Sequence, residues 1–123
     1  MMKRILAFDY GTHHIGVSFT ESKIGEPLSP LINNSRLLEN IKLLVERYNP
    51  EELVVGLPHG PLHKPVRVFA SSLSIFRLPV HLHPETLSTQ EALQKLKAAG
   101  ASRAKLRSEH SYAATLILED YLV

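Results

Sequence analysis

A short apolar run near the N-terminus ends in an aspartate and resumes after a tight turn. Residues 5–8 (ILAF) lead into Asp9, and residues 15–19 (IGVSF) continue with the alternation typical of a strand. These lengths favour two short strands joined as a hairpin over helices. Gly11 follows the aspartate and permits the close approach of a backbone or a phosphate. Asp9 is therefore a candidate ligand at a strand end, although an aspartate is also a common turn residue.

The rest of the chain alternates amphipathic helices with short apolar strands. In order, the sequence predicts a connection or ragged edge strand (25–34), a helix capped by Ser35 and ended by Asn49-Pro50, a strand (52–58), an irregular segment (59–65), a helix (66–76), a strand (78–83), a helix from Ser88 or Thr89 to Gly100, a basic loop (101–107) and a helix (109–122). The last helix is expected to bury Tyr112, Ala113, Leu116, Ile117 and Tyr121. A helix followed by a nearly continuous apolar strand is typical of parallel βαβ units, so the predicted fold class is α/β.

Composition limits the chemistry that the chain can carry. At 123 residues, 44% of them hydrophobic, the chain is expected to form one globular domain over residues 1–123. Because it has no cysteine, disulfides, iron–sulfur clusters and thiolate zinc sites are excluded, and any metal must use Asp, Glu or His. We expect a cytoplasmic protein without a membrane span. The net charge of +2 is compatible with a nucleic-acid partner.

A second carboxylate lies between a predicted inner strand and a helix start. Glu85 follows the strand at 78–83 and precedes Ser88 and Thr89, either of which can cap a helix. A carboxylate in this position can simply be a partner of the helix dipole. If the sheet is parallel here, however, Asp9 and Glu85 lie at the same end of the sheet, where two convergent carboxylates would bind Mg²⁺ or Mn²⁺.

A third candidate, Glu109-His110, stands at the start of the last predicted helix. An imidazole ligand there suits Mn²⁺, Zn²⁺ or Fe²⁺ better than Mg²⁺, although a histidine at a helix start is commonly solvated. The loop before it carries Arg103, Lys105 and Arg107. These three cations either follow a phosphate backbone or form a solvated linker.

Other metal and nucleotide motifs are absent from the sequence. The seven histidines include no HExxH spacing, and the chain has no GxGxxG, GxxxxGK[ST] or GxSxG motif. His81 and His83 share one face of a predicted strand, which makes them either further ligands or surface residues. Zinc-protease, nucleotide-loop and serine-hydrolase functions are not indicated.

Four blocks, in order along the chain, resemble the bacterial YqgF (RuvX) family. They are residues 8–17 (FDYGTHHIGV), 54–58 (VVGLP), 85–89 (ETLST) and 113–122 (AATLILEDYL). The resemblance implies a ribonuclease-H-like three-layer fold, in which a mixed five-stranded sheet has helices on both faces, as in the Holliday-junction resolvase RuvC. It also implies a metal-dependent nuclease that either matures the 5′ end of pre-16S rRNA or resolves Holliday-junction-like DNA.

The resemblance also implies a ligand set with one departure from the family pattern. Asp9 matches the family's strand-one aspartate, and Glu85 matches the glutamate of its Asp-Glu-Arg-Leu-Ser-Thr block. His110 stands where the family has its third acid, and Pro84 and Thr86 replace the Asp and Arg beside the glutamate. Because a neutral histidine removes one negative charge, we expect Mg²⁺ or Mn²⁺ with Mn²⁺ favoured.

The expected partner is nucleic acid, either pre-rRNA or branched DNA, with no membrane partner. The residues expected to contact it are Gly11, Thr12, His14, Ser88, Thr89, Arg103, Lys105 and Arg107. The protein would act as a monomer or a homodimer, and resolving a junction would require the dimer. The alternative is a non-catalytic nucleic-acid-binding or ribosome-assembly protein whose site has drifted, because Pro84, Thr86 and His110 all depart from the family pattern.

Overall fold

The protein is described by a computed structural model covering residues 3–58, 60–85 and 109–123, in which the described side chains of the last segment begin at Ser111. Two predictions fall outside these residues. They are the helix from Ser88 or Thr89 to Gly100 and the basic loop at 101–107. All structural statements below concern the described ranges.

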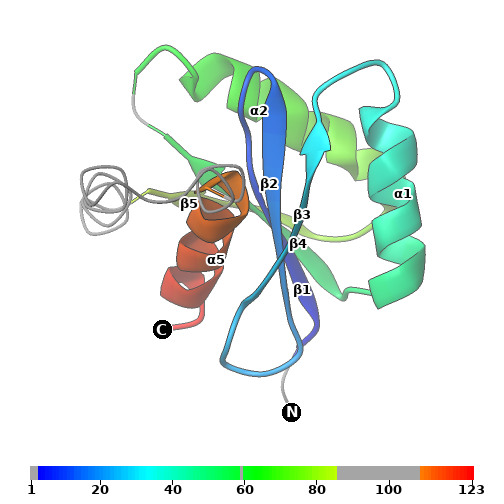
Figure 1. Cartoon of the computed structure of the whole chain (residues 1–123), viewed down its shortest axis with the longest axis vertical. Coiled ribbons are helices and arrows are strands. Elements are labelled where there is room, and N and C mark those ends of the chain that lie inside the picture. The colour runs from blue at the N-terminus through cyan, green and yellow to red at the C-terminus, as the bar shows by residue number, and fades with distance from the viewer. Residues whose placement is uncertain (1–2, 59, 86–108) are drawn as a thin grey trace.

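The described residues form five strands and three α-helices (Figure 1). The strands are β1 (Ile5–Asp9), β2 (His14–Thr20), β3 (Glu26–Ile32), β4 (Glu52–Leu57) and β5 (Val80–Pro84). The helices are α1 (Leu37–Tyr48), α2 (His63–Ser72), which continues into the 3₁₀ helix η1 (Leu73–Phe76), and α5 (Glu109–Tyr121). Among the described residues, no helix is long and apolar enough to cross a membrane.

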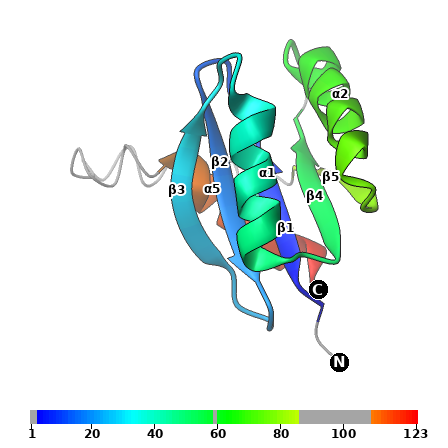
Figure 2. The same cartoon turned by 90° about the vertical axis from the view of Figure 1, so that its right-hand side faces the viewer.

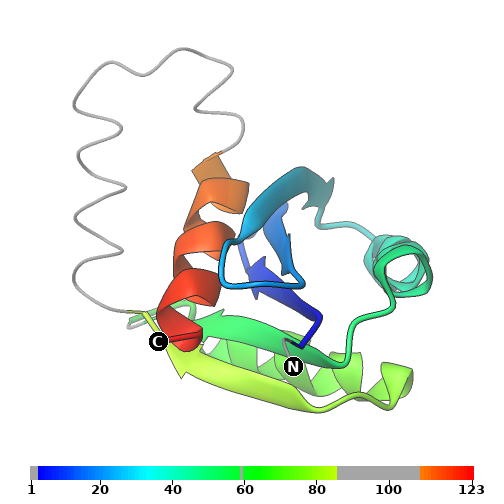
Figure 3. The ribbon, with the colours of Figure 1, turned by 90° about the horizontal axis from the view of Figure 1, so that it is seen from below.

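The strands form one mixed sheet in the order β3-β2-β1-β4-β5. β1 is antiparallel to β2 and parallel to β4, and β4 is parallel to β5. Figures 2 and 3 show α1 and α2 on one face of this sheet and α5 on the other. The predicted three-layer fold with helices on both faces is therefore confirmed. β1, β4 and β5 finish at the same end of the sheet, called here the carboxyl end.

Alternation along β1 and β4 divides the interior into two clusters. Leu6, Phe8, Leu53 and Val55 pack with residues of α1 and α2. Ile5, Ala7 and Val54 pack with Ile117 and Leu118 of α5. Because successive side chains of a strand point to opposite faces, Asp9, two residues after Ala7, belongs to the α5 face.

Of the two alternatives predicted for residues 25–34, the ragged edge strand is confirmed: β3 lies at the edge of the sheet, tolerates two prolines there, and shifts its register with β2 between Ile15 and Val17. Two other local predictions were wrong. The N-cap of α1 is Arg36 and makes no side-chain cap hydrogen bond, so Ser35 is not the cap. Helix α2 begins at His63, within the segment predicted to be irregular, because a proline in a first helical turn removes no intrahelical hydrogen bond.

The buried face of α5 also differs from the prediction. Tyr112 is 40% exposed and Leu116 is half-buried. Ala113 and Ile117 are buried as predicted, and two polar side chains, Ser111 and Thr115, are buried against the sheet as well. Ser111 Oγ donates to Leu28 O at 2.5 Å and accepts from Val17 N at 3.3 Å, and Thr115 Oγ1 lies 3.1 Å from Ser18 Oγ. Hydrophobic periodicity misses this face because its polar groups are buried as a bonded set.

Candidate active site

The two predicted carboxylates meet at the carboxyl end of the sheet. Asp9 is the last residue of β1, and Glu85 directly follows β5. The backbone N–H of Glu85 donates to Leu57 O at 3.0 Å, which extends the β4–β5 pairing by one residue. Glu85 lies two residues beyond His83, which is level with Gly56. Strand alternation therefore directs both carboxylates to the α5 face.

The pKa of Glu85 is raised from 4.5 to about 7. The largest cause is partial burial, followed by the negative charge of Asp9 and a side-chain hydrogen bond with Asp9. Like charges held close in a partly dry setting keep one of the two groups protonated. Removing that proton leaves two adjacent anions, an arrangement that a divalent cation stabilises.

Gly56 lies beside Glu85 and makes room for Ile117 of α5. It follows Val55, which is level with Phe8 of β1, so Gly56 stands between the strand ends that carry Asp9 and Glu85. A Cβ atom on Gly56 would lie 2.4 Å from Ile117 Cδ1 and 3.5 Å from Glu85 Oε1. Gly56 belongs to the 54–58 block (VVGLP), but no role at the site was predicted for it, although a glycine inside a buried strand is a known sign of close approach.

Helix α5 brings its first turn toward the same end of the sheet. Ser111 contacts Val17, which is level with Phe8 of β1, whereas Tyr121 at the other end of the helix reaches Glu52 at the start of β4. The helix therefore starts near the end of β1. His110 belongs to its first turn, but its side chain is outside the described residues, so its role as a ligand stays a prediction.

The β1–β2 turn, residues 10–13, lies beside Asp9 and is held to the end of β3 by two hydrogen bonds. Asn33 Nδ2 donates to Gly11 O at 2.9 Å, and Asn33 N donates to His13 O, also at 2.9 Å. Gly11 is buried, whereas Thr12 and His14 are exposed at the carboxyl end. The expected nucleic-acid contacts Gly11, Thr12 and His14 are therefore gathered beside Asp9, while Ser88, Thr89, Arg103, Lys105 and Arg107 lie outside the described residues.

His81 and His83 have protein partners on the α5 face. His83 Nε2 lies 2.7 Å from Asp120 Oδ2, and His81 Nε2 lies 3.7 Å from Glu52 Oε2. Both rings contact Tyr121, with centroids 5.8 Å from His81 and 5.6 Å from His83. These histidines thus connect the strand that carries Glu85 to the C-terminal end of α5. Their shared face was predicted from the sequence, but their partners were not, because those come from distant segments.

The donor set fits a hard divalent cation. Within the described ranges no group of three His, Cys, Asp or Glu side chains could hold a metal ion, so the described part of the site consists of Asp9 and Glu85. Two adjacent carboxylates are suitable oxygen ligands for Mg²⁺ or Mn²⁺. A complete site needs a further ligand, for which His110 is the candidate.

A strand-end carboxylate pair on a ribonuclease-H-like sheet defines a class of nucleic-acid-processing hydrolases, and comparison with known proteins agrees. Residues 3–123 match the family described as "RuvX: Holliday junction resolvase". A "Putative pre-16S rRNA nuclease" of Buchnera aphidicola is 38% identical, covering 95% of this chain and 94% of the relative. A protein of the same description from Moorella thermoacetica is 39% identical, covering 97% and 94%.

The fold is shared with a solved resolvase. Thermus thermophilus RuvC, in a structure with a Holliday junction substrate, aligns with a TM-score of 0.56 at 13% identity, covering 94% of this chain and 92% of RuvC. At that identity the likeness shows the fold alone. Together with the family match over nearly the whole length, it means that this chain belongs to the RuvX family and is a hydrolase of the nuclease type.

Replacing Gly56 by alanine should destabilise the protein by about 1–3 kcal/mol, because the added methyl overlaps Ile117 in a packed interior. Urea unfolding measures this loss. Ile117→Val removes the clashing Cδ1 atom and alone should cost about 0.5–1.5 kcal/mol. The double variant should therefore be more stable than the sum of the single losses predicts. Strict additivity would contradict the placement of Gly56 against Ile117.

Without a divalent cation, the stability of the protein should fall as pH rises from about 4.5 to 7. Glu85 is charged in the unfolded chain over this window but retains a proton in the folded one, so the unfolded state binds fewer protons. Asp9→Asn removes the charge repulsion and should flatten the fall without abolishing it, because burial of Glu85 remains. Melting temperatures measured in EDTA across this range check the expectation.

The control for this pH series is Glu21→Gln, which removes an exposed carboxylate. It should follow the wild-type pH dependence. An unchanged slope in Asp9→Asn would contradict the coupling between the two site carboxylates.

Proposed function

We propose that this RuvX-family nuclease is metal-dependent and that Asp9, Glu85 and His110 form its catalytic metal site. The observation that carries the proposal is the convergence of Asp9 and Glu85, which raises the pKa of Glu85 to about 7. Structural carboxylates normally avoid such proximity because it destabilises the folded chain. The arrangement is instead typical of sites whose function needs concentrated negative charge.

The chain's own residues would position the metal ion and the phosphodiester. Asp9 and Glu85 would supply oxygen ligands from the ends of two parallel strands, β1 and β5. A divalent cation bound there would activate the attacking water and stabilise the leaving oxygen of the phosphodiester. The β1–β2 turn, with Gly11 and Thr12, and the adjoining His14 lie where a phosphate backbone would approach the carboxylates.

The substrate we propose is the 5′ end of pre-16S rRNA, with DNA four-way junctions as the second choice. The names of the relatives support the first, and the junction complex of RuvC supports the second. Ser88, Thr89, Arg103, Lys105 and Arg107 complete the proposed phosphate contacts. Cations in that segment would offset the missing arginine at Thr86, since arginine can clamp a phosphate with two hydrogen bonds and threonine cannot.

A second candidate is a nucleic-acid-binding protein without catalysis. The neutral His110 and the loss of the family's Asp and Arg at Pro84 and Thr86 favour it. The two functions differ in one respect that can be measured, because only the nuclease needs Asp9 for a metal-dependent change in the RNA.

An RNA spanning the 5′ precursor end of 16S rRNA should be cut by the wild-type protein in Mn²⁺ and, more slowly, in Mg²⁺. Asp9→Asn should lower the rate about 100-fold or more, since the ligand contributes several kcal/mol of charge stabilisation. Glu21→Gln should keep the wild-type rate. Equal rates for wild type and Asp9→Asn would reject the proposed site and favour the binding function.

His110→Asp should raise the rate in Mg²⁺, because it restores a third negative oxygen ligand to the site. His110→Asn is the matched control, since it removes the imidazole without adding charge and should lower the rate in both metals. Single-turnover cleavage in each metal makes the comparison. If His110→Asp merely loses activity, His110 does not stand in for a carboxylate ligand.

A further inference from the structure

A cavity of about 410 Å³ lies beside the β1–β2 turn, on the face of the sheet opposite α5. Its wall begins with Tyr10, the residue after Asp9, and continues through Leu37 of α1 and Phe69 of α2. Asn33 also lines it and is the residue whose side chain donates to Gly11 O. The cavity therefore shares its wall with the turn that follows the catalytic aspartate.

The lining is mainly aromatic and aliphatic. The rings of Tyr10 and Phe69 have centroids 5.3 Å apart and are tilted by 43°. Val68, on the α2 side of the cavity, is 65% exposed, although it is a large apolar residue of a chain with a well-packed core. The volume falls within the roughly 300–1,000 Å³ typical of small-ligand pockets. A planar, apolar group of modest size fits this lining.

The charged side chain that lines the cavity is a cation. It is Lys64, and the helix that carries it, α2 (His63–Ser72), has no acidic residue. Aromatic surface next to a cationic side chain is the combination that binds single-stranded nucleic acid, in which bases stack and phosphates are neutralised.

We infer that the cavity receives one unpaired base of the nucleic-acid strand whose backbone lies at Asp9 and Glu85. The inference rests on the proposed nuclease function. Asp9 and Tyr10 are neighbours, with Cα atoms about 3.8 Å apart, and their side chains belong to opposite faces of the sheet. A nucleic-acid strand that crosses the end of the sheet over Gly11 would place a phosphate on the α5 face and the adjoining base on the opposite face, at the cavity.

The inference gives the site a substrate preference. A base held in a duplex cannot enter a cavity beside the scissile phosphate without unpairing, which costs a few kcal/mol. The protein would therefore select a bond next to an unpaired nucleotide, as in a single-stranded extension beside a stem.

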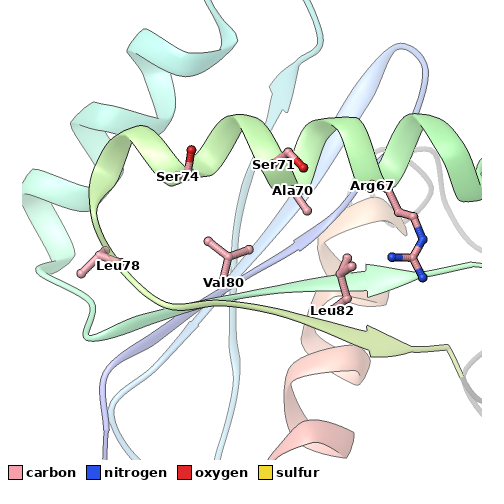
Figure 4. A pocket seen from close by; sticks show the side chains of 7 residues that line it. All are labelled: Arg67, Ala70, Ser71, Ser74, Leu78, Val80 and Leu82. Atoms are coloured by element: carbon pink, nitrogen blue, oxygen red, sulfur yellow. The ribbon is translucent and has the colours of Figure 1, made fainter.

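A second cavity, of about 400 Å³, does not share this relation to the site (Figure 4). It lies between the helical segment α2–η1 and β5, where Arg67, Val80 and Leu82 line it. None of its lining residues belongs to β1 or to the β1–β2 turn.

The experiment uses a stem-loop RNA with a short single-stranded 5′ extension, in which each extension nucleotide in turn is replaced by an abasic one. Binding is measured in EDTA, so that the RNA stays intact. For the wild-type protein, one position should weaken binding about tenfold, the loss expected for one stacked base. Val68→Trp fills the cavity from an exposed position and should bind all the RNAs equally, at the level of that abasic RNA.

Ile75→Trp is the matched control, because Ile75 is a β-branched residue of similar exposure, 61% against 65%, and does not line the cavity. It should keep the position dependence of the wild type. A wild-type protein that binds none of these RNAs or shows no special position, or a Val68→Trp variant that keeps the dependence, would overturn the inference. So would a change of oligomeric state in Val68→Trp, which would make the cavity a contact between copies.

Cleavage of the unmodified RNA in Mn²⁺ separates this inference from the proposed function. Asp9-dependent cleavage without a special base position contradicts the base cavity alone. A special base position without Asp9-dependent cleavage contradicts the nuclease function alone.

Discussion

The proximity of two carboxylates, Asp9 and Glu85, is the constraint on which the rest of the structure depends. Placing like charges together in a partly buried setting opposes folding, so the surroundings must hold them there. Parallel pairing of β1, β4 and β5 brings both residues to the carboxyl end of the sheet. On β4, the strand between them, Gly56 leaves the space that Ile117 of α5 occupies.

Helix α5 is fixed to the sheet by hydrogen bonds as well as by apolar contact. Ser111 and Thr115 are buried against β2 and β3 at the N-terminal half of the helix. At the other end, Asp120 pairs with His83, and Tyr121 donates to Glu52. Bonds of this kind specify one position and direction for the helix, because a shift would leave buried polar groups unpaired. The first turn of α5, which contains His110, is thereby brought toward the carboxylates.

Much of this arrangement could be predicted from the sequence, because local patterns encode it. Short apolar runs located β1 and β4, hydrophobic alternation located β2, and two carboxylates after apolar strands indicated a metal site. What escaped prediction depends on contacts between distant segments. The buried polar face of α5 resembles a surface until its partners on β2 and β3 are known, and the need for glycine at position 56 becomes visible only once Ile117 lies opposite it.

The most direct test of the account is a crystal structure of the protein soaked in Mn²⁺, with the metal located by its anomalous scattering. The account predicts an ion bound by side-chain oxygens of both Asp9 and Glu85 and by a nitrogen of His110, at about 2.0–2.3 Å. An ion bound elsewhere, or a site at which Asp9 and Glu85 stay free of metal at saturating Mn²⁺, would contradict it.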